Sequence, residues 1–317
     1  MIRLTGPIGI AALAATIGLS TATFAQNYPS QPVRIIVPFS AGSATDILAR
    51  IVADKMAERW GQNVIVENRA GLSGTTVAAK SAPDGYTLML TSNGHTIAGV
   101  INKNLSFDPV KDFAGITPVA NVPLVMITPP DMSAKNLHEF ILLAKANPGK
   151  FNFASPGLGS SGFIAGALFN VAAGVNIVHV PYKGAPESLT SIIRGDSQLY
   201  SVPVNVGSEH IITGRVRALA VMTAERNPIL KDVPTLKEAG LDLVYDSWFG
   251  LMAPSATPRD IIAKINRDVV DILKSPDTKA KLDAQGVIPM PLTPEQFDKI
   301  IAGDTAKLTE MFKDGVK

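Results

Sequence analysis

Short runs of aliphatic and β-branched residues alternate along the chain with longer stretches whose apolar residues recur every three or four positions. The first pair predicts a strand over 33–37 and, after the loop 38–46, a helix ending at Trp60. Gly61 stands where a C-terminal helix cap is expected. The apolar positions of this helix are Ile47, Leu48, Ile51, Val52 and Met56. Strand, loop and helix in this order are typical of parallel α/β units.

The pattern continues with a strand over 62–68, a helix over 74–81, a turn at 83–85 and a strand over 86–90. That last strand leads into Ser92, Asn93 and His95. We therefore predict a first lobe built on a three-strand open sheet with its loops at one end.

Residues 113–130 are rich in Val, Ile and Pro without helical period, and they predict an extended crossover into a second lobe. There the order repeats, with a strand over 152–154, a loop over 155–161, a helix over 162–171 and a strand over 176–180. We predict a return crossover over 245–252. The predicted domains are a lobe formed by 26–124 and 246–317 and a lobe formed by 125–245.

The N-terminal segment 1–25 carries one charged residue, Arg3, followed by an apolar stretch over 7–19. A membrane-spanning helix needs about 20 apolar residues, so this stretch is too short. Thr23 and Ala25 fit the small-residue positions before a signal-peptidase cut. We therefore predict export to the periplasm and a mature chain beginning near Gln26. The alternative is an N-terminal amphipathic helix or membrane anchor, and no stop-transfer flank supports it.

Composition excludes several classes of partner. The formal net charge is +2 and no basic run is interleaved with aromatic residues, so nucleic acid is not an expected partner. The chain has Cys 0 and therefore offers no disulfide, thiol nucleophile or lipid-attachment site. We expect a soluble, monomeric mature protein with no cofactor and no metal.

Chemistry is expected in the loops, because ligands of open parallel sheets bind beyond the carboxyl ends of the strands. Ser43, Thr45 and Asp46 stand at one predicted helix start, and Ser160 and Ser161 at another. A helix start attracts anions by about 0.3–1 kcal/mol when exposed and up to about 2 when partly buried. Two facing each other would form a carboxylate clamp. The alternative is that these side chains only cap helices.

The segment 157–162 matches the dinucleotide-binding fingerprint G-x-G-x-x-G after a strand and before a helix. That fold also needs an acidic residue at the end of the next strand, and this chain has Val180, Pro181, Tyr182 and Lys183 there. A dinucleotide-binding enzyme is therefore a remote alternative. The nucleophile pattern G-x-S-x-G is absent.

The histidines are far apart and none forms an H-x-x-x-H pair, so no metal site is predicted. His95 follows a strand end and is a candidate ligand contact, whereas His179 is expected in the core or hinge. For Tyr182, a contact with the ligand and a role in packing are equally expected. Trp248 and Phe249 are expected to pack at the return crossover.

Several motifs stand in order along nearly the whole mature chain, and they lie at 28–29, 33–39, 42–46, 66–71, 83–87, 155–161, 180–184 and 233–235. With these motifs the chain resembles the receptors of tripartite tricarboxylate transporters, often called Bug proteins. The resemblance implies a type II, Venus-flytrap periplasmic binding protein with two open sheets joined by crossover strands. Loops 39–46 and 155–161 would hold a carboxylate, partly through ordered water, and the receptor would deliver it to membrane transporter subunits. A ligand-presenting partner of a periplasmic sensor domain is the alternative.

The chain departs from the family pattern near the expected pocket. Ser43 replaces a second glycine, Phe163 replaces a histidine, and the strand 198–203 lacks an aspartate. These changes predict an aromatic acid or a dicarboxylate such as terephthalate rather than an amino acid, whose ammonium would need a carboxylate. Phe163 can equally belong to the core. The predicted ligand-binding residues are Phe39, Ala41, Gly42, Ser43, Ala44, Thr45, Asp46, Ser92, Asn93, His95, Ser155, Gly157, Gly159, Ser160, Ser161, Tyr182, Ser201 and Pro203.

Overall fold

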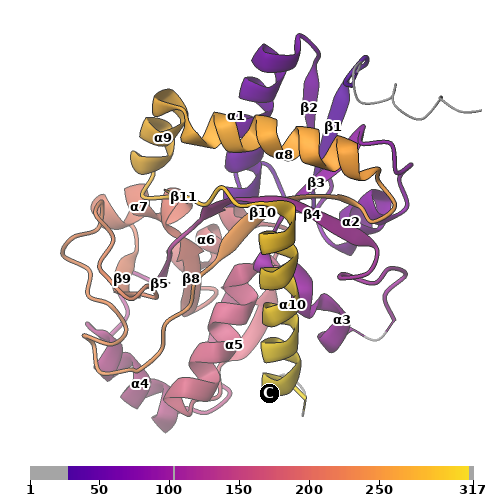
Figure 1. The fold of residues 1–317 in the computed structure, drawn as a ribbon. Coiled ribbons are helices and arrows are strands. Elements are labelled where there is room, and N and C mark those ends of the chain that lie inside the picture. The colour runs from indigo at the N-terminus through magenta and orange to yellow at the C-terminus, as the bar shows by residue number, and fades with distance from the viewer. Residues whose placement is uncertain (1–27, 103, 314–317) are drawn as a thin grey trace, which may run out of the picture.

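Two mixed sheets form the framework of the computed structural model, which describes residues 28–102 and 104–313 (Figure 1). The predicted signal peptide lies outside the described residues. The first part of the chain forms β1 (Val33–Val37), α1 (Ala44–Trp60), β2 (Val64–Asn68), α2 (Leu72–Ala79), β3 (Thr87–Ser92), the 3-10 helix η2 (Asn93–Ile97), α3 (Ala98–Ile101) and β4 (Phe113–Asn121).

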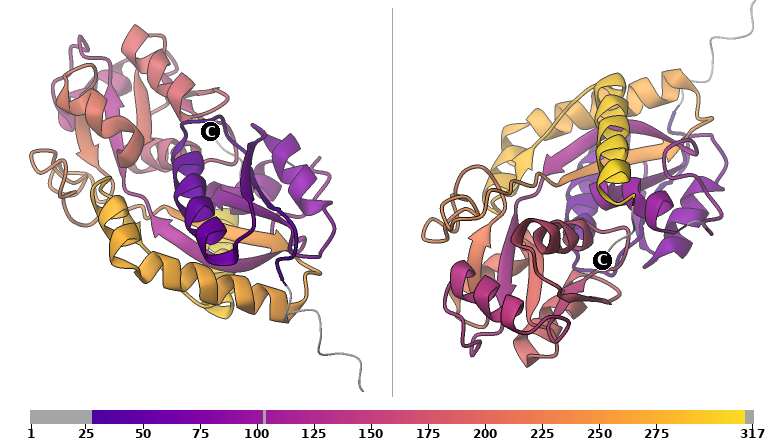
Figure 2. Two further views of the ribbon diagram at one scale, coloured as in Figure 1. Left: turned by 90° about the horizontal axis from the view of Figure 1, so that it is seen from above. Right: turned by 90° about the horizontal axis from the view of Figure 1, so that it is seen from below.

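The middle of the chain forms the second lobe, seen beside the first in Figure 2. Its elements are β5 (Leu124–Thr128), α4 (Leu137–Ala146), β6 (Asn152–Ser155), α5 (Ser161–Ala173), β7 (Val178–Pro181), α6 (Ala185–Arg194), β8 (Leu199–Pro203), α7 (Val204–Ile212) and β9 (Arg217–Val221). The last part returns to the first lobe as β10 (Trp248–Pro254), α8 (Arg259–Lys274), α9 (Pro276–Asp283), β11 (Ile288–Pro289) and α10 (Pro294–Met311).

The internal repeat predicted from the sequence appears in the strand orders. The first sheet runs β11-β4-β10-β3-β1-β2 and the second runs β7-β6-β8-β5-β9. In both, a central strand pairs in parallel with its two neighbours, and the next strand out is antiparallel. The antiparallel strand of the second sheet, β5, is the strand by which the chain enters the second lobe. The antiparallel strand of the first sheet, β10, is the strand by which the chain returns to the first lobe. The predicted three-strand first sheet is therefore too small, because β10, β4 and β11 extend it.

The two crossovers lie side by side. Val122 donates its N–H to the Ser247 carbonyl at 2.8 Å, and Asn121 donates its side-chain amide to the Asp246 carboxylate at 3.2 Å. These two hydrogen-bonded segments are the chain connections between the lobes. Relative motion of the lobes must therefore bend the chain at these segments.

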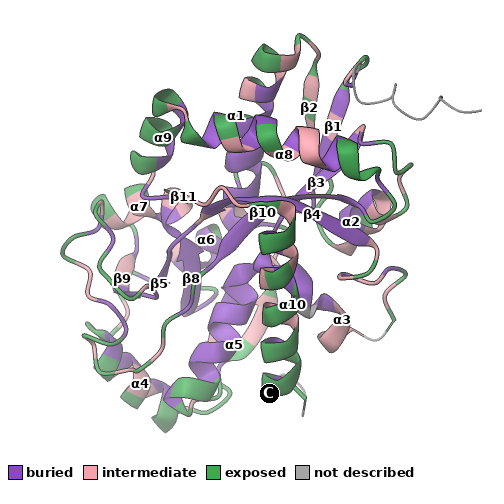
Figure 3. Ribbon diagram, viewed as in Figure 1, coloured by how far each residue is buried: buried purple, intermediate pink, exposed green. Residues whose placement is uncertain are grey.

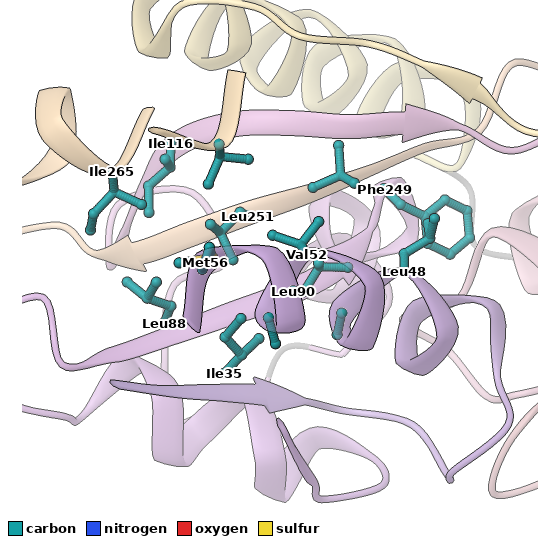
Figure 4. Packing of buried hydrophobic residues seen from close by; sticks show 14 of the residues in the cluster. Ile35, Leu48, Val52, Met56, Leu88, Leu90, Ile116, Phe249, Leu251 and Ile265 are labelled. Atoms are coloured by element: carbon teal, nitrogen blue, oxygen red, sulfur yellow. The ribbon is translucent and has the colours of Figure 1, made fainter. Parts of the chain in front are cut away.

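Helix α1 is positioned by its caps and its buried face. Ser43 caps its start, and Gly61 ends it in the left-handed region with φ 64°. Leu48, Val52 and Met56 are each 0% exposed and pack on β1, β3 and β10, as Figure 4 shows. Each such burial contributes roughly 1.5–3 kcal/mol. This packing fixes the direction in which the N-terminus of α1 points.

Helix α10 packs on both lobes. Phe297 and Ile301 join a cluster of the first lobe, whereas Leu308 and Phe312 join the core that contains α5. Figure 3 shows α5 almost wholly buried beside the outward-facing, exposed stripe of α10. Helices α4, α7 and α9 were not predicted from the sequence. In the described residues no helix is long and apolar enough to cross a membrane.

Candidate ligand-binding site

A small chamber lies between the lobes where the N-termini of α1 and α5 meet. We call it the first chamber. It combines residues of the loop before α1, the loop before α5, and the ends of β3, β8 and β10. Its lining residues are Phe39, Ser43, Ala44, Thr45, Ser92, Pro156, Ser160, Ser161, Gly162, Ala185, Tyr200, Pro203 and Phe249.

The first turn of α1 presents unpartnered N–H groups to this chamber. The Ser43 hydroxyl accepts the Asp46 N–H at 3.3 Å, and the Ser43 carbonyl accepts the Ile47 N–H at 3.0 Å. In the described structure the N–H groups of Ala44 and Thr45 have no acceptor. Both residues line the chamber.

The first turn of α5 repeats this arrangement. The Ser160 hydroxyl accepts the Phe163 N–H at 3.2 Å, and the Ser160 carbonyl accepts the Ile164 N–H at 3.3 Å. The N–H groups of Ser161 and Gly162 have no acceptor within the described ranges. Each lobe therefore contributes an equivalent pair of free donors and the positive end of a helix dipole.

Hydroxyl groups add to these donors. Thr45 and Ser161 are 2% and 3% exposed, and neither hydroxyl has a partner in the described part of the chain. The Ser43 hydroxyl accepts one bond and keeps its proton free to donate. The Ser160 hydroxyl differs, because it already donates to the Gly157 carbonyl at 2.7 Å. Ser43 and Ser160 are thus both helix caps, and Ser43 has a donor left for a ligand.

Among the described residues, no lysine or arginine belongs to the lining of the first chamber. Asp46 lies just behind it, and its carboxylate accepts from the Gly42 N–H, Asn68 and Arg50. Burial raises the pKa of Asp46, and these bonds outweigh burial and hold the pKa below its usual range. The carboxylate therefore stays ionised and is fully engaged within its own lobe. The chamber can bind an anion only through N–H and O–H donors.

The lobes touch at the rim of the chamber. Ser40 donates its N–H to the Lys183 carbonyl at 3.4 Å and its hydroxyl to Glu187 at 2.9 Å. Ser92 donates its hydroxyl to the Gly159 carbonyl at 3.4 Å. These bonds join residues of different lobes, so they form only when the lobes are together.

Other predicted site residues lie outside the first chamber. Ala41 and Gly42 are exposed. Asn93 bridges the crossover, where its side chain accepts from the Tyr245 hydroxyl at 2.9 Å and donates to the Asp246 carbonyl at 3.1 Å. Asn93 thus ties η2 to the hinge.

Three more predicted residues belong to the second lobe. The Ser155 hydroxyl bonds the His179 ring at 2.7 Å. The Tyr182 hydroxyl lies 3.3 Å from that of Ser197. The Ser201 hydroxyl is buried without a partner among the described residues. Phe163 is 1% exposed and packs against Phe153 and His179 in the core of this lobe.

His95, Gly157 and Gly159 line a different cavity, adjacent to the first chamber. His95 Nε2 donates to the Pro109 carbonyl at 2.7 Å, because that carbonyl can only accept. Burial lowers the pKa of His95 to about 4, so the ring is neutral at physiological pH.

Sequence reasoning missed several lining residues. Phe249 was expected only to pack at the crossover, and it both packs with Leu48 and lines the chamber (Figure 4). Tyr200 is the second residue of β8, and burial raises the pKa of its hydroxyl. Ala185 opens α6. A comparison of β8 with β3, which contributes Ser92, could have pointed to Tyr200.

Metal binding has no support in the described residues, where no cluster of three His, Cys, Asp or Glu side chains occurs. Two lobes that meet over a chamber of unpartnered donors define a solute-binding receptor. The family model of the tripartite tricarboxylate transporter family receptor matches residues 48–315. This chain belongs to that family, as the resemblance predicted.

Known proteins agree with this assignment. BugT of Bordetella pertussis is 35% identical over 312 residues, which cover 96% of this chain and 94% of BugT. A solved R. palustris protein with adipate has a TM-score of 0.85 and 30% identity, covering 90% of this chain and 97% of that chain. MatC from Rhodopseudomonas palustris with bound malate has a TM-score of 0.84 and 29% identity, covering 89% and 99%. The predicted two-lobed α/β fold is confirmed, and the family is one of receptors rather than enzymes.

Proposed function

We propose that this receptor captures a small carboxylate between its lobes in the periplasm and delivers it to the membrane subunits of a tripartite tricarboxylate-type transporter. The observation that carries the proposal is the pair of helix N-termini, one from each lobe, that bring unpartnered donors to one chamber. Relatives solved with adipate and malate support carboxylates as the ligand class. Family membership supports the transporter as partner.

Export by cleavage near Gln26 and a monomeric mature protein are part of this proposal. So is the division into a lobe of 26–124 and 246–317 and a lobe of 125–245. The membership of β5 to β9 in the second sheet supports that division. The packing of Leu308 and Phe312 on the second lobe makes α10 a brace between the two units.

We propose an aromatic acid or a dicarboxylate such as terephthalate as the ligand. Phe39, Tyr200 and Phe249 place aromatic surface beside the donors. In the part of the chain that the structure describes, no acidic side chain lines the chamber, so the ammonium group of an amino acid would lose its hydration without a counter-charge.

The test is a thermal-shift screen of residues 26–317 with mono-, di- and tricarboxylates, aromatic acids, amino acids and NAD. An acid present at about 100 times its dissociation constant adds roughly 2.7 kcal/mol of stability. Ser43→Ala should weaken binding of the best acid. Asn136→Ala is the matched control, because Asn136 caps exposed α4 in the same way, far from the chamber. A melting temperature raised by NAD and by no acid would refute the proposal.

A further inference from the structure

A second chamber adjoins the first. Phe39 and Pro156 line both. Successive side chains of a strand point to opposite faces of its sheet. Accordingly, Ser92 at the end of β3 lines the first chamber, whereas the preceding Thr91 lines the second. The second chamber is the larger of the two.

Buried polar groups without partners line the second chamber. Thr75 and Thr91 are 5% and 1% exposed, and neither hydroxyl has a hydrogen-bond partner in the described residues. His95 uses its Nε2 proton on the Pro109 carbonyl, which leaves Nδ1 as an acceptor without a partner in the same set of residues. Polar groups that face a chamber are usually satisfied by water or by a ligand, so these three groups favour an occupant that can both donate and accept.

The other walls are apolar and uncharged. Leu72, Ala98, Phe107 and Leu158 contribute them, and no Lys, Arg, Asp or Glu of the described ranges belongs to the lining. At the uncapped start of α2, the Leu72 N–H is a helix N-terminal donor that borders this chamber. The first chamber offers two such pairs and further hydroxyls. A second carboxylate in this chamber would exchange its hydration for fewer helix N-terminal donors than the first chamber offers. It would also face the lone pair of His95 Nδ1.

We propose that the second chamber holds the uncharged, hydroxyl-bearing end of an aromatic acid whose carboxylate is held in the first chamber. This inference rests on the proposed function and narrows its ligand class. The hydroxyl donates to His95 Nδ1 and accepts from Thr75 or Thr91. Phe39, at the border of the two chambers, and Phe107 flank the ring.

The test is isothermal titration calorimetry of residues 26–317 near neutral pH with benzoate, 3- and 4-hydroxybenzoate, and terephthalate. One of the hydroxybenzoates should bind most tightly. Thr75→Val and Thr91→Val should each weaken that binding by about two- to tenfold, the effect of one neutral hydrogen bond. Both variants should weaken benzoate binding less than they weaken hydroxybenzoate binding, because benzoate has no ring hydroxyl. Thr128→Val is the matched control, because it removes an equally buried, unpartnered hydroxyl from β5 in the second lobe.

The outcomes separate the two proposals. The proposal for the second chamber is wrong if the acids bind equally with and without a ring hydroxyl, or if the threonine variants bind like the wild type. Neither result contradicts the proposed function as a carboxylate receptor. If terephthalate binds most tightly, the proposal that the second chamber holds an uncharged end of the ligand is wrong. Binding of none of the four acids, with a thermal shift by another carboxylate, also refutes the aromatic assignment. Binding of no carboxylate at all removes both proposals.

Discussion

Gly94 is the position where one methyl group should separate ligand binding from folding. A Cβ atom added there would lie 2.4 Å from the Ser160 carbonyl carbon, 2.5 Å from that of Gly159 and 2.6 Å from the Gly159 oxygen. All three are backbone atoms of the opposite lobe, so no side-chain rotation removes the clash. Optimal carbon–carbon contacts are about 3.5–4.0 Å, and Gly94→Ala must therefore push the lobes about 1 Å apart.

Overpacking of this kind costs about 1–3 kcal/mol. Because the crossovers can bend, the cost falls on the closed arrangement, and the apparent dissociation constant of the best acid should rise about 5- to 150-fold. The free energy of unfolding of the ligand-free protein should stay nearly constant. Calorimetry measures the affinity, and solution scattering should show a larger radius with ligand than the wild type has.

Gly303→Ala is the matched control, since its Cβ would meet nothing within 4 Å and it lies on exposed α10 surface outside the lining of both chambers. If Gly94→Ala binds the acid as tightly as this control does, the lobes do not close as the structure has them. A large loss of stability of the ligand-free Gly94→Ala variant would mean that the clash destabilises the fold itself and not only the closed arrangement. That result would also refute the reasoning.

Three further predictions concern donors, pH and the hinge. Thr45→Val and Ser161→Ala should each weaken acid binding by about tenfold or more in calorimetry, because a hydrogen bond to a charged group is worth about 1.5–3 kcal/mol; unchanged affinity would remove these hydroxyls from the site. His95 titrates near 6.5 when unfolded and at about 4 when folded, so the unfolded state takes up its proton first as pH falls. His95 should thus contribute a loss of stability of up to about 3 kcal/mol between those pH values in urea unfolding. His95→Gln should remove that part of the slope and leave the part due to His179, whose pKa burial also lowers to about 4. Trp248→Phe should cost about 1–3 kcal/mol in urea unfolding at neutral pH, because it removes the 2.7 Å bond to the Asp304 carboxylate, whose pKa burial already raises. Asp304→Asn keeps an acceptor without the charge and should be nearly neutral, so equal losses in both would contradict this account.

Local signals predicted the framework of the fold well. The serines before α1 and α5 and the glycine after α1 mark both helix starts and one helix end, and the structure has Ser43, Ser160 and Gly61 in those caps. A cap depends on residues within one helical turn, so sequence alone can define it. The repeat of strand, loop and helix then predicted that the two N-termini would be equivalent.

The rest of the site depends on contacts between distant segments. Phe249 reaches the chamber because β10 pairs with β3, more than 150 positions earlier in the chain. Asp46 was expected to face the ligand, and its carboxylate is instead engaged by Asn68 and Arg50, a network that only the packing of β2 beside α1 creates. Likewise the second chamber exists because Thr75, from α2, comes to lie beside Thr91, from β3. No local pattern encodes these pairings.

The division of donors between the lobes has a consequence for how the receptor works. The first lobe alone offers the N–H groups of Ala44 and Thr45, and the second alone offers those of Ser161 and Gly162. Neither set of donors alone can replace the hydration shell of a carboxylate, whereas the two sets together nearly replace it. Since no lysine or arginine among the described lining residues supplies long-range attraction, affinity must come from short hydrogen bonds that exist only when the lobes meet. Ligand binding and lobe closure are therefore one equilibrium, and the contacts at Gly94 and Ser40 set its balance as much as the donors do.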